Sequence, residues 1–170
     1  MATDAEGLRL EDHLCFAVYS ASRALTRAYA PLLAPFGLTY PQYLALLVLW
    51  EQDAVSVSQL GERLGLDSAT LTPMLKRLEA QGIVTRERDA ADERVVRIRL
   101  TAEGRALNRS MRQVPSALAC RSGFDVDDPK SLARLGRLRE QLQALVADVE
   151  RTKPTPAGEK GRARRTAAGR

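Results

Sequence analysis

The spacing of apolar residues changes abruptly at Gly82. Before it, residues 58–65 and 68–82 repeat apolar side chains at helical spacing and are separated by a tight glycine turn. After it, residues 83–88 and 94–100 alternate as β-strands do, with a polar loop between them. A short helix, a second helix and a hairpin in this order predict a helix-turn-helix followed by a β-hairpin wing.

The segments on either side of this region read as helices. Pro31, Pro35 and Gly37 end the first, and Tyr40-Pro41 opens the second, which is apolar on nearly every side. We therefore predict a mainly α fold with a small β-hairpin wing. The additional helices are expected over residues 8–34, 40–52, 101–120 and 131–150.

The net charge of +5 does not by itself indicate a nucleic-acid-binding protein. Residues 151–170 contain seven Lys and Arg and one Glu, so the remaining 150 residues carry a net charge of −1. This tail is rich in Pro, Gly, Ala and Arg without an apolar stripe, and we expect it to be disordered. Only the local distribution of charge can support DNA binding.

Residues 67–77 have the composition of a helix that enters the major groove of DNA. Small polar side chains come first and cations follow, which lets the backbone approach phosphates and base edges. Pro73 departs from a good helix former, and we expect it within about the first turn. The candidate DNA-binding residues here are Ser68, Thr70, Thr72, Pro73, Lys76 and Arg77.

Arg94, at the end of the loop between the two strands, suits a wing tip. A single arginine on a narrow hairpin can enter the minor groove. Asp89 and Asp92 would repel phosphate if they faced it, so we expect at least one to be structural, with Asp92 orienting Arg94 through a salt bridge. A solvated helix and hairpin is the alternative, and the order of the elements favours DNA binding.

The stretch DSATLTPMLKRLEAQGIVTRERDAADERVVRIRLTAEG resembles the helix-turn-helix and wing of MarR-family repressors. The pattern is a recognition helix ending in LxxxG and two hydrophobic residues, then RxxDxxDxR, then LTxxG. The resemblance covers about residues 8–150. It implies a homodimer that binds a pseudo-palindromic site on double-stranded DNA and is not an enzyme. We expect one domain over residues 1–150, with dimerisation helices over about 8–52 and 101–150 and the DNA-binding part over about 53–100.

Five polar or reactive side chains share one face of the first predicted helix. Hydroxyls directed at a sulfur stabilise the thiolate and lower the pKa of the thiol. Tyr19 is one turn from Cys15, but Tyr29 is about 21 Å away along the helix axis. Only an antiparallel copy of this helix, supplied by a two-fold dimer, can bring Tyr29 to Cys15. The face is formed by Cys15, Tyr19, Ser22, Thr26 and Tyr29.

A cysteine on a largely apolar helix is also commonly an inert buried side chain. A second resemblance favours a reactive thiol, because LEDHLCFAVYSASRALTRAY and LTYPQYLALLVLWE resemble the organic hydroperoxide sensors of the MarR family, the OhrR group. This resemblance implies that Cys15 senses peroxide. It also implies that Tyr29 and Tyr40 of the partner subunit hydrogen-bond its thiolate, with assistance from Tyr19.

One branch of the OhrR group has a second cysteine on the fifth helix, which resolves the sulfenic acid as an intersubunit disulfide. Cys120 lies at the end of the corresponding helix, so the chain resembles this two-cysteine branch. The alternative is a structural cysteine. The resemblance implies a repressor that an organic hydroperoxide releases from its operator through a Cys15–Cys120 disulfide.

Two other functions remain open: a MarR-type sensor that binds a phenolic ligand at the dimer seam, without thiol chemistry, and a thiol peroxidase that uses both cysteines catalytically. No metal site or cofactor is expected, because two distant cysteines do not form a zinc motif. The first ten residues lack a signal-peptide pattern and no apolar run is long enough to cross a membrane, so we expect a cytoplasmic protein.

Overall fold

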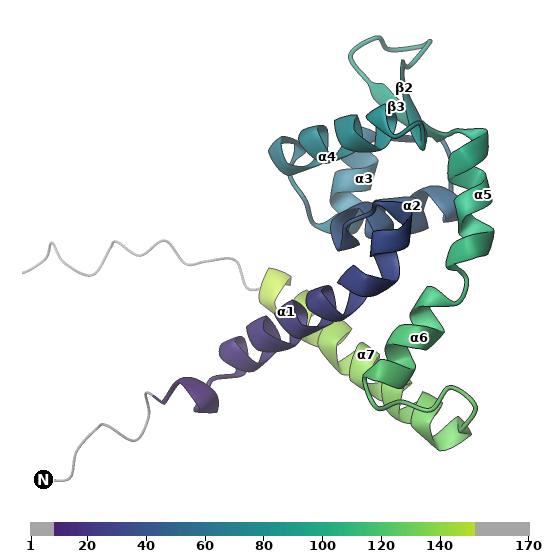
Figure 1. The fold of residues 1–170 in the computed structure, drawn as a ribbon. Helices are drawn as coiled ribbons and strands as arrows, with labels where there is room; N and C mark the ends of the chain where they lie inside the picture. Colours follow the sequence, from purple (N-terminus) through teal and green to yellow (C-terminus); the bar gives the residue numbers. More distant parts are fainter. Residues whose placement is uncertain (1–8, 152–170) are drawn as a thin grey trace, which may run out of the picture. The chain divides into compact units, whose positions relative to one another are not determined.

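The computed structural model describes residues 9–151, in two units that divide between Gly123 and Phe124. The predicted tail over residues 151–170 lies, apart from Arg151, outside the described residues. In chain order (Figure 1) the elements are the 3₁₀ turn η1 (Leu10–Asp12), α1 (Leu14–Leu33), the 3₁₀ turn η2 (Ala34–Phe36), α2 (Tyr40–Glu51), β1 (Val55–Ser56), α3 (Val57–Leu64), α4 (Ser68–Ala80), β2 (Val84–Arg88), β3 (Val96–Leu100), α5 (Ala102–Met111), α6 (Val114–Arg121) and α7 (Pro129–Arg151).

Helix α2 is the central element of the first unit. It contacts α1, α3, α4, α5 and β3, and its buried side chains include Tyr43, Leu46 and Leu49. The helix begins where the sequence predicts, because the backbone N–H of Thr39 donates to Oε1 of Gln42 at 2.8 Å in a capping box. Burial on several sides explains why this segment shows no amphipathic pattern.

Helices α3 and α4 form the predicted helix-turn-helix. Ser56 begins α3 by accepting a hydrogen bond from the N–H of Gln59 at 3.1 Å, and Gly65 ends it with a left-handed φ of 63°. The turn is tight, since a Cβ on Gly61 would lie 2.7 Å from the carbonyl oxygen of Leu66. The glycines therefore set the close approach of the two helices.

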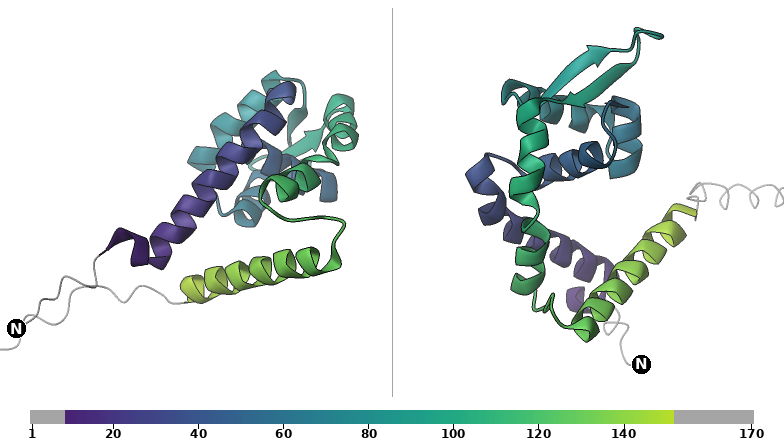
Figure 2. Two further views of the ribbon diagram at one scale, coloured as in Figure 1. Left: turned by 60° about the horizontal axis from the view of Figure 1, so that its bottom comes forward. Right: turned by 90° about the vertical axis from the view of Figure 1, so that its right-hand side faces the viewer.

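The hairpin of β2 and β3 extends from the helices of the first unit, as the right-hand view in Figure 2 shows. The sequence analysis did not predict β1, which pairs antiparallel with β3 and places Val55 opposite Ile98. The sheet thus has the order β1-β3-β2. Two residues are too few to show an alternating pattern, so the sequence does not predict β1.

The single helix predicted over residues 101–120 is wrong. The chain forms α5 and α6 instead, with a break at Arg112 and Gln113. Pro115 causes the break, because it has no N–H to donate to the carbonyl of Met111 and its ring would clash there. The first predicted helix is also shorter than expected, since α1 starts at Leu14 after the η1 turn.

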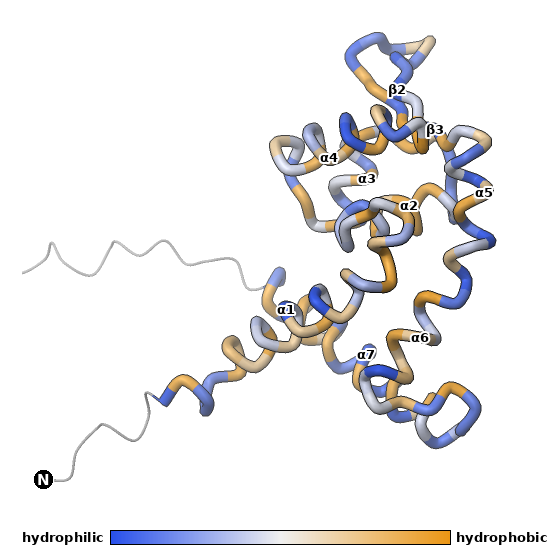
Figure 3. The backbone as a smooth tube through the Cα atoms, in the orientation of Figure 1, coloured by the Kyte–Doolittle hydropathy of each residue, from blue (hydrophilic) through white to orange (hydrophobic). Residues whose placement is uncertain are grey.

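The second unit contains α7, which begins close to the predicted position. Asp128 precedes it and accepts hydrogen bonds from the N–H groups of Lys130 and Ser131 at 3.1 and 3.0 Å. None of residues 129–151 is buried. Hydrophobic and hydrophilic residues alternate along the helix in Figure 3. Its exposed apolar side chains are Leu132, Leu138, Leu142, Val146 and Val149.

Gly104 lets α5 pack directly against the start of the hairpin. A Cβ at this position would lie 2.2 Å from the carbonyl oxygen of Ile83. The carbonyl of Gly104 accepts a hydrogen bond from Nε1 of Trp50 at 2.9 Å, which joins α5 to the end of α2. The glycine of the LTxxG pattern is thus required by packing.

We expect Gly104→Ala to destabilise the protein by more than about 2 kcal/mol, since the added methyl group meets a backbone atom that cannot move aside. Urea unfolding followed by circular dichroism measures the change. Arg109→Ala, at an exposed position of the same helix, is the control and is expected to stay within about 0.5 kcal/mol of the native protein. Equal stability of the two variants would contradict the packing role.

Candidate functional site

The outward face of α4 carries the side chains that the sequence analysis assigned to DNA. Leu71 and Leu75 point into the core, together with Met74 and Leu78. Thr72 is half-buried, and the other five candidates on this helix are exposed: Ser68, Thr70, Pro73, Lys76 and Arg77. The helix therefore presents hydroxyls at its first turn and two cations further along.

Asp67 caps the N-terminus of α4. Its Oδ1 accepts a hydrogen bond from the N–H of Thr70 at 2.8 Å. The hydrogen bonds from Thr70 lower the pKa of Asp67, so the carboxylate is charged at neutral pH. This negative charge occupies the N-terminal end of the helix, which leaves Lys76 and Arg77 as the charges on α4 that suit phosphate.

Pro73 does not fall in the first turn as expected, because it is the sixth residue of α4. A proline there cannot donate to the carbonyl of Ala69. The hydroxyl of Thr72, beside it, is directed back onto the helix, as its Oγ1 donates to the carbonyl oxygen of Ser68 at 2.7 Å. The hydroxyl of Thr72 is thus engaged within the helix, while Pro73 is an exposed apolar contact on the outer face.

At the wing tip, Arg94 is in contact with Asp92. Nε of Arg94 lies 3.0 Å from Oδ1 and Nη2 lies 3.2 Å from Oδ2, and 90% of the arginine side chain is exposed. The guanidinium lowers the pKa of Asp92, and the carboxylate raises the pKa of Arg94. The two-point contact fixes the plane of the guanidinium while leaving the side chain open to a groove.

Asp89, at the start of the loop, is paired with Arg97 of β3. The hydrogen bond from Arg97 lowers the pKa of Asp89, and the N–H groups of Ala91 and Asp92 also donate to its carboxylate. Asp89 and Asp92 are therefore engaged by arginines and backbone rather than left free to repel phosphate, while Glu93, the third acid of the loop, is exposed.

Cys15 is the second residue of α1 and is exposed. Tyr19, one turn later, is 55% exposed, and its hydroxyl oxygen accepts a hydrogen bond from Nη1 of Arg23 at 2.9 Å. Leu14 and Val18 are exposed beside them. The first turns of α1 therefore present a thiol, a phenol and apolar side chains on the surface of a single chain.

Tyr29 and Tyr40 lie together at the far end of α1. Their rings stack with centroids 4.4 Å apart, and Tyr43 lies 5.7 Å from Tyr29. Burial raises the pKa of Tyr29 to about 12 and raises that of Tyr40 as well. Both phenols are protonated at neutral pH and can donate hydrogen bonds. Since α1 is unbroken from Cys15 to Tyr29, the two are about 21 Å apart along its axis.

Cys120 is exposed near the end of α6, the helix that packs against α1. Because of the break after Met111, this cysteine is on a separate short helix rather than on a continuation of α5.

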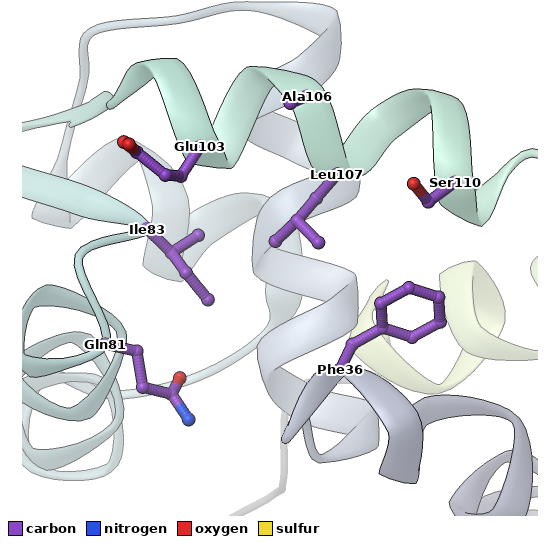
Figure 4. Close-up of a pocket in the computed structure, with 7 residues that line it drawn as sticks. All are labelled: Phe36, Gln81, Ile83, Glu103, Ala106, Leu107 and Ser110. Carbon is purple, nitrogen blue, oxygen red and sulfur yellow. The ribbon is translucent and has the colours of Figure 1, made fainter.

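A hollow of about 540 Å³ lies in the first unit, beside the C-terminal end of α4 (Figure 4). Phe36, Ile83 and Leu107 form its apolar part, while Gln81 and Glu103 supply polar groups. The sequence analysis did not find it, because its lining comes from η2, the end of α4 and α5, which are far apart in the chain.

Among residues 9–151 no group of three His, Cys, Asp or Glu side chains is placed to hold a metal ion. In the same range, no single helix has the length and apolar composition to cross a membrane. Only α1 with η2 and α2 taken together meet that test, and they are bent by 72°.

A helix-turn-helix whose second helix exposes hydroxyls and cations, followed by a hairpin with an arginine at its tip, defines a winged-helix DNA-binding protein. A model of the MarR family matches residues 38–96. The chain belongs to the MarR family of transcriptional regulators, and its relatives in sequence and structure agree with this. Its class is therefore that of DNA-binding regulators and not of enzymes, as the sequence predicts.

Two curated relatives extend the match along the chain. The chain is 50% identical to the HTH-type transcriptional regulator TtmR of Methylorubrum extorquens, over 83% of this chain and 73% of that protein. It is 47% identical to the organic hydroperoxide resistance transcriptional regulator of Bacillus subtilis, over 77% of this chain and 91% of that protein.

Among solved structures, reduced AbfR bound to DNA superposes with a TM-score of 0.64 at 37% identity, over 85% of this chain and 99% of that chain. AbfR is a protein of Staphylococcus epidermidis. It has also been solved overoxidised and bound to DNA, and with a disulfide formed. The disulfide form matches with a TM-score of 0.56 at 39% identity, over 79% of this chain and 92% of that chain. The mainly helical winged helix-turn-helix fold predicted from the sequence is thereby confirmed.

We expect Lys76→Ala to weaken binding to all DNA sequences and to reduce the slope of log affinity against log salt by roughly one unit, because one phosphate contact is lost. Fluorescence anisotropy at several salt concentrations measures both. Arg139→Ala, which removes an exposed cation of α7, is the control and should leave the slope unchanged. A native slope in the Lys76 variant would remove this residue from the phosphate contacts.

Proposed function

We propose that this protein is a homodimeric, cytoplasmic repressor that senses organic hydroperoxides through Cys15 and leaves its operator when Cys15 forms a disulfide with Cys120 of the partner subunit. The observation that carries the proposal is the separation of the thiol from the phenols. Cys15 lies at one end of α1, and a stacked, protonated pair of tyrosines lies at the other. Within one chain, Cys15 has neither Tyr29 nor Tyr40 near it. An antiparallel α1 helix from a second copy of the chain would bring these phenols to the thiol.

The exposed apolar side chains support a dimer. Leu14, Val18 and Leu25 of α1 are exposed in one chain, and none of the residues of α7 is buried. Burying one such side chain contributes roughly 1.5–3 kcal/mol, which gives two copies of these helices a strong tendency to associate. We assign dimerisation to the N- and C-terminal helices, over about residues 8–52 and 101–150, and DNA binding to about residues 53–100.

A two-fold axis that runs two α1 helices antiparallel places Tyr29 and Tyr40 of one subunit near Cys15 of the other. Their hydroxyls are protonated at neutral pH and can donate hydrogen bonds to the sulfur. Such bonds favour the thiolate over the thiol. Tyr19 adds a third phenol from the same subunit, one turn from the sulfur.

The proposed reaction begins with attack of the Cys15 thiolate on the O–O bond of a hydroperoxide. The sulfur gains one oxygen as sulfenic acid, and the other oxygen leaves as an alcohol after taking a proton from a nearby phenol or water. The thiol of Cys120 of the partner subunit then attacks the sulfenic sulfur, which forms the disulfide and releases water. The thiols must start reduced, which is the condition in the cytoplasm.

The disulfide supplies the free-energy difference that shifts the dimer from its DNA-binding form to a form that does not bind DNA. A dimer on a pseudo-palindromic site places two α4 helices in successive major grooves, so their spacing decides affinity. A shift from 99% to 1% of competent dimers requires about 5.5 kcal/mol, which a covalent bond supplies. AbfR, which has been solved on DNA in its reduced and overoxidised forms, also forms a disulfide. We therefore assign release to the bridge and not to oxidation of one sulfur.

A second function is favoured by the hollow between η2, α4 and α5. Its apolar part and its polar groups suit a small aromatic ligand, and a ligand there would touch Gln81 at the end of the recognition helix. This site differs from the phenolic-ligand alternative of the sequence analysis, which places the ligand at the dimer seam, because the hollow lies within one chain. It needs no cysteine.

We expect Cys15→Ser to bind operator DNA with native affinity and to lose all response to cumene hydroperoxide in a gel shift. Cys120→Ser is expected to be oxidised at Cys15 but to remain on DNA, since no bridge forms. DNA from the region upstream of this chain's own gene is the first duplex to use. Release of the Cys15→Ser protein by hydroperoxide would contradict the thiol mechanism, and release by a phenolic compound alone would support the ligand function.

A further inference from the structure

Arg97 links the wing to the body of the first unit, in addition to the pairing of β1 with β3 and the Arg86–Glu79 ion pair. Arg97 of β3 pairs through Nε with the carboxylate of Asp89, and its Nη1 donates to the carbonyl oxygen of Ala54 at 2.9 Å. Ala54 lies between α2 and β1. The guanidinium of Arg97 therefore connects the wing loop to the segment between α2 and β1.

At its outer end, this connection determines the shape of the loop. The carboxylate of Asp89 accepts from the N–H of Ala91 at 2.8 Å and from that of Asp92 at 3.3 Å. The N–H of Asp89 donates to the carbonyl of Val95 at 2.8 Å. Asp92 is the residue that holds Arg94. The position of the wing arginine thus depends on Asp89.

At its inner end, the connection reaches a strained residue. Ala54 has a φ of 61°, which is unfavourable for an alanine and persists only where neighbouring groups hold it. Oδ1 of Asp53 holds its N–H at 2.8 Å and also accepts from the N–H of Leu100 at 2.9 Å, while Oδ2 lies 3.4 Å from Nη1 of Arg105 in α5. Asp53 therefore joins the end of α2, the end of β3 and α5.

We propose that Arg97, Asp89 and Asp53 act together as positioning residues for DNA binding, and we call these three residues the wing brace. They fix the direction of the hairpin relative to α4, so that Arg94 enters the minor groove while Lys76 and Arg77 lie over the major groove. A two-stranded hairpin is marginally stable by itself, and an unbraced wing would lose conformational entropy each time it bound. The inference depends on the DNA binding of the family and not on the cysteine chemistry.

The alternative role for Arg97 is direct contact with phosphate. Its guanidinium already has two acceptors in the unbound protein, and its side chain is 39% exposed against 90% for Arg94. A phosphate contact would add to the effect of Arg94 independently. A brace would instead make the effect of Arg94 depend on Arg97, and this difference can be measured.

The test is a double-mutant cycle between Arg94→Ala and Arg97→Met, read as the Kd for duplex DNA from the upstream region by fluorescence anisotropy at one salt concentration. We expect Arg94→Ala to weaken binding by about tenfold or more in the native background, as for loss of one groove contact. In the Arg97→Met background its effect should fall below about threefold, since the wing no longer presents Arg94 in place. An undiminished effect of Arg94→Ala in that background would overturn the proposal.

Arg99→Met is the matched control. Arg99 is two residues along the same strand and pairs with Glu87 at 3.0 Å, so its loss removes the same charge without touching the wing brace. The full effect of Arg94→Ala should persist in this background. Arg97→Lys is the second variant, because it keeps the charge but lacks the fork that spans two acceptors. It should resemble Arg97→Met in the cycle. Near-native behaviour of Arg97→Lys would indicate a simple charge contact and reject the brace.

Discussion

Apolar surface that one chain cannot bury is the constraint on which this structure depends. The residues of α7 contribute no buried side chain, and the first turns of α1 expose Leu14 and Val18 around Cys15. Helices of this kind are stabilised by packing and not by propensity, so they require a partner surface. A second copy of the chain is the partner that we propose, and the sensor then forms from two chains.

The DNA-binding part satisfies its own requirements within one chain. Its helices α3 and α4 are capped by Ser56 and Asp67, its core is closed around α2, and Asp89 and Asp92 of the wing are paired with arginines. In the function that we propose, the two activities are separated along the chain: the winged helix is complete in each subunit, while association of two subunits would complete the thiol site. Such an arrangement lets a disulfide between subunits alter the spacing of the two α4 helices while each winged helix stays folded.

Much of this organisation could be predicted from the sequence, because it depends on local patterns. Apolar periodicity gave the helices and the hairpin, and Gly65 marked the turn between α3 and α4. What could not be predicted depends on contacts between distant residues: the pairing of β1 with β3, the hollow beside Phe36, and the link from Arg97 to Ala54. The break before Pro115 was a missed local signal, since a proline in a helical pattern predicts an interruption.

A mixed dimer tests most directly whether the thiol site is shared between subunits. One chain carries Cys15→Ser and the other carries Tyr29→Phe with Tyr40→Phe, and differently tagged copies allow the heterodimer to be purified. Its one Cys15 belongs to the chain without the two phenols, but the partner still has them. If phenols act across the interface, this thiol should react with cumene hydroperoxide at the native rate, as followed by mass spectrometry of oxidised Cys15, whether as sulfenic acid or as its disulfide with Cys120. Reaction as slow as in the Tyr29→Phe, Tyr40→Phe homodimer would contradict a site formed by two chains.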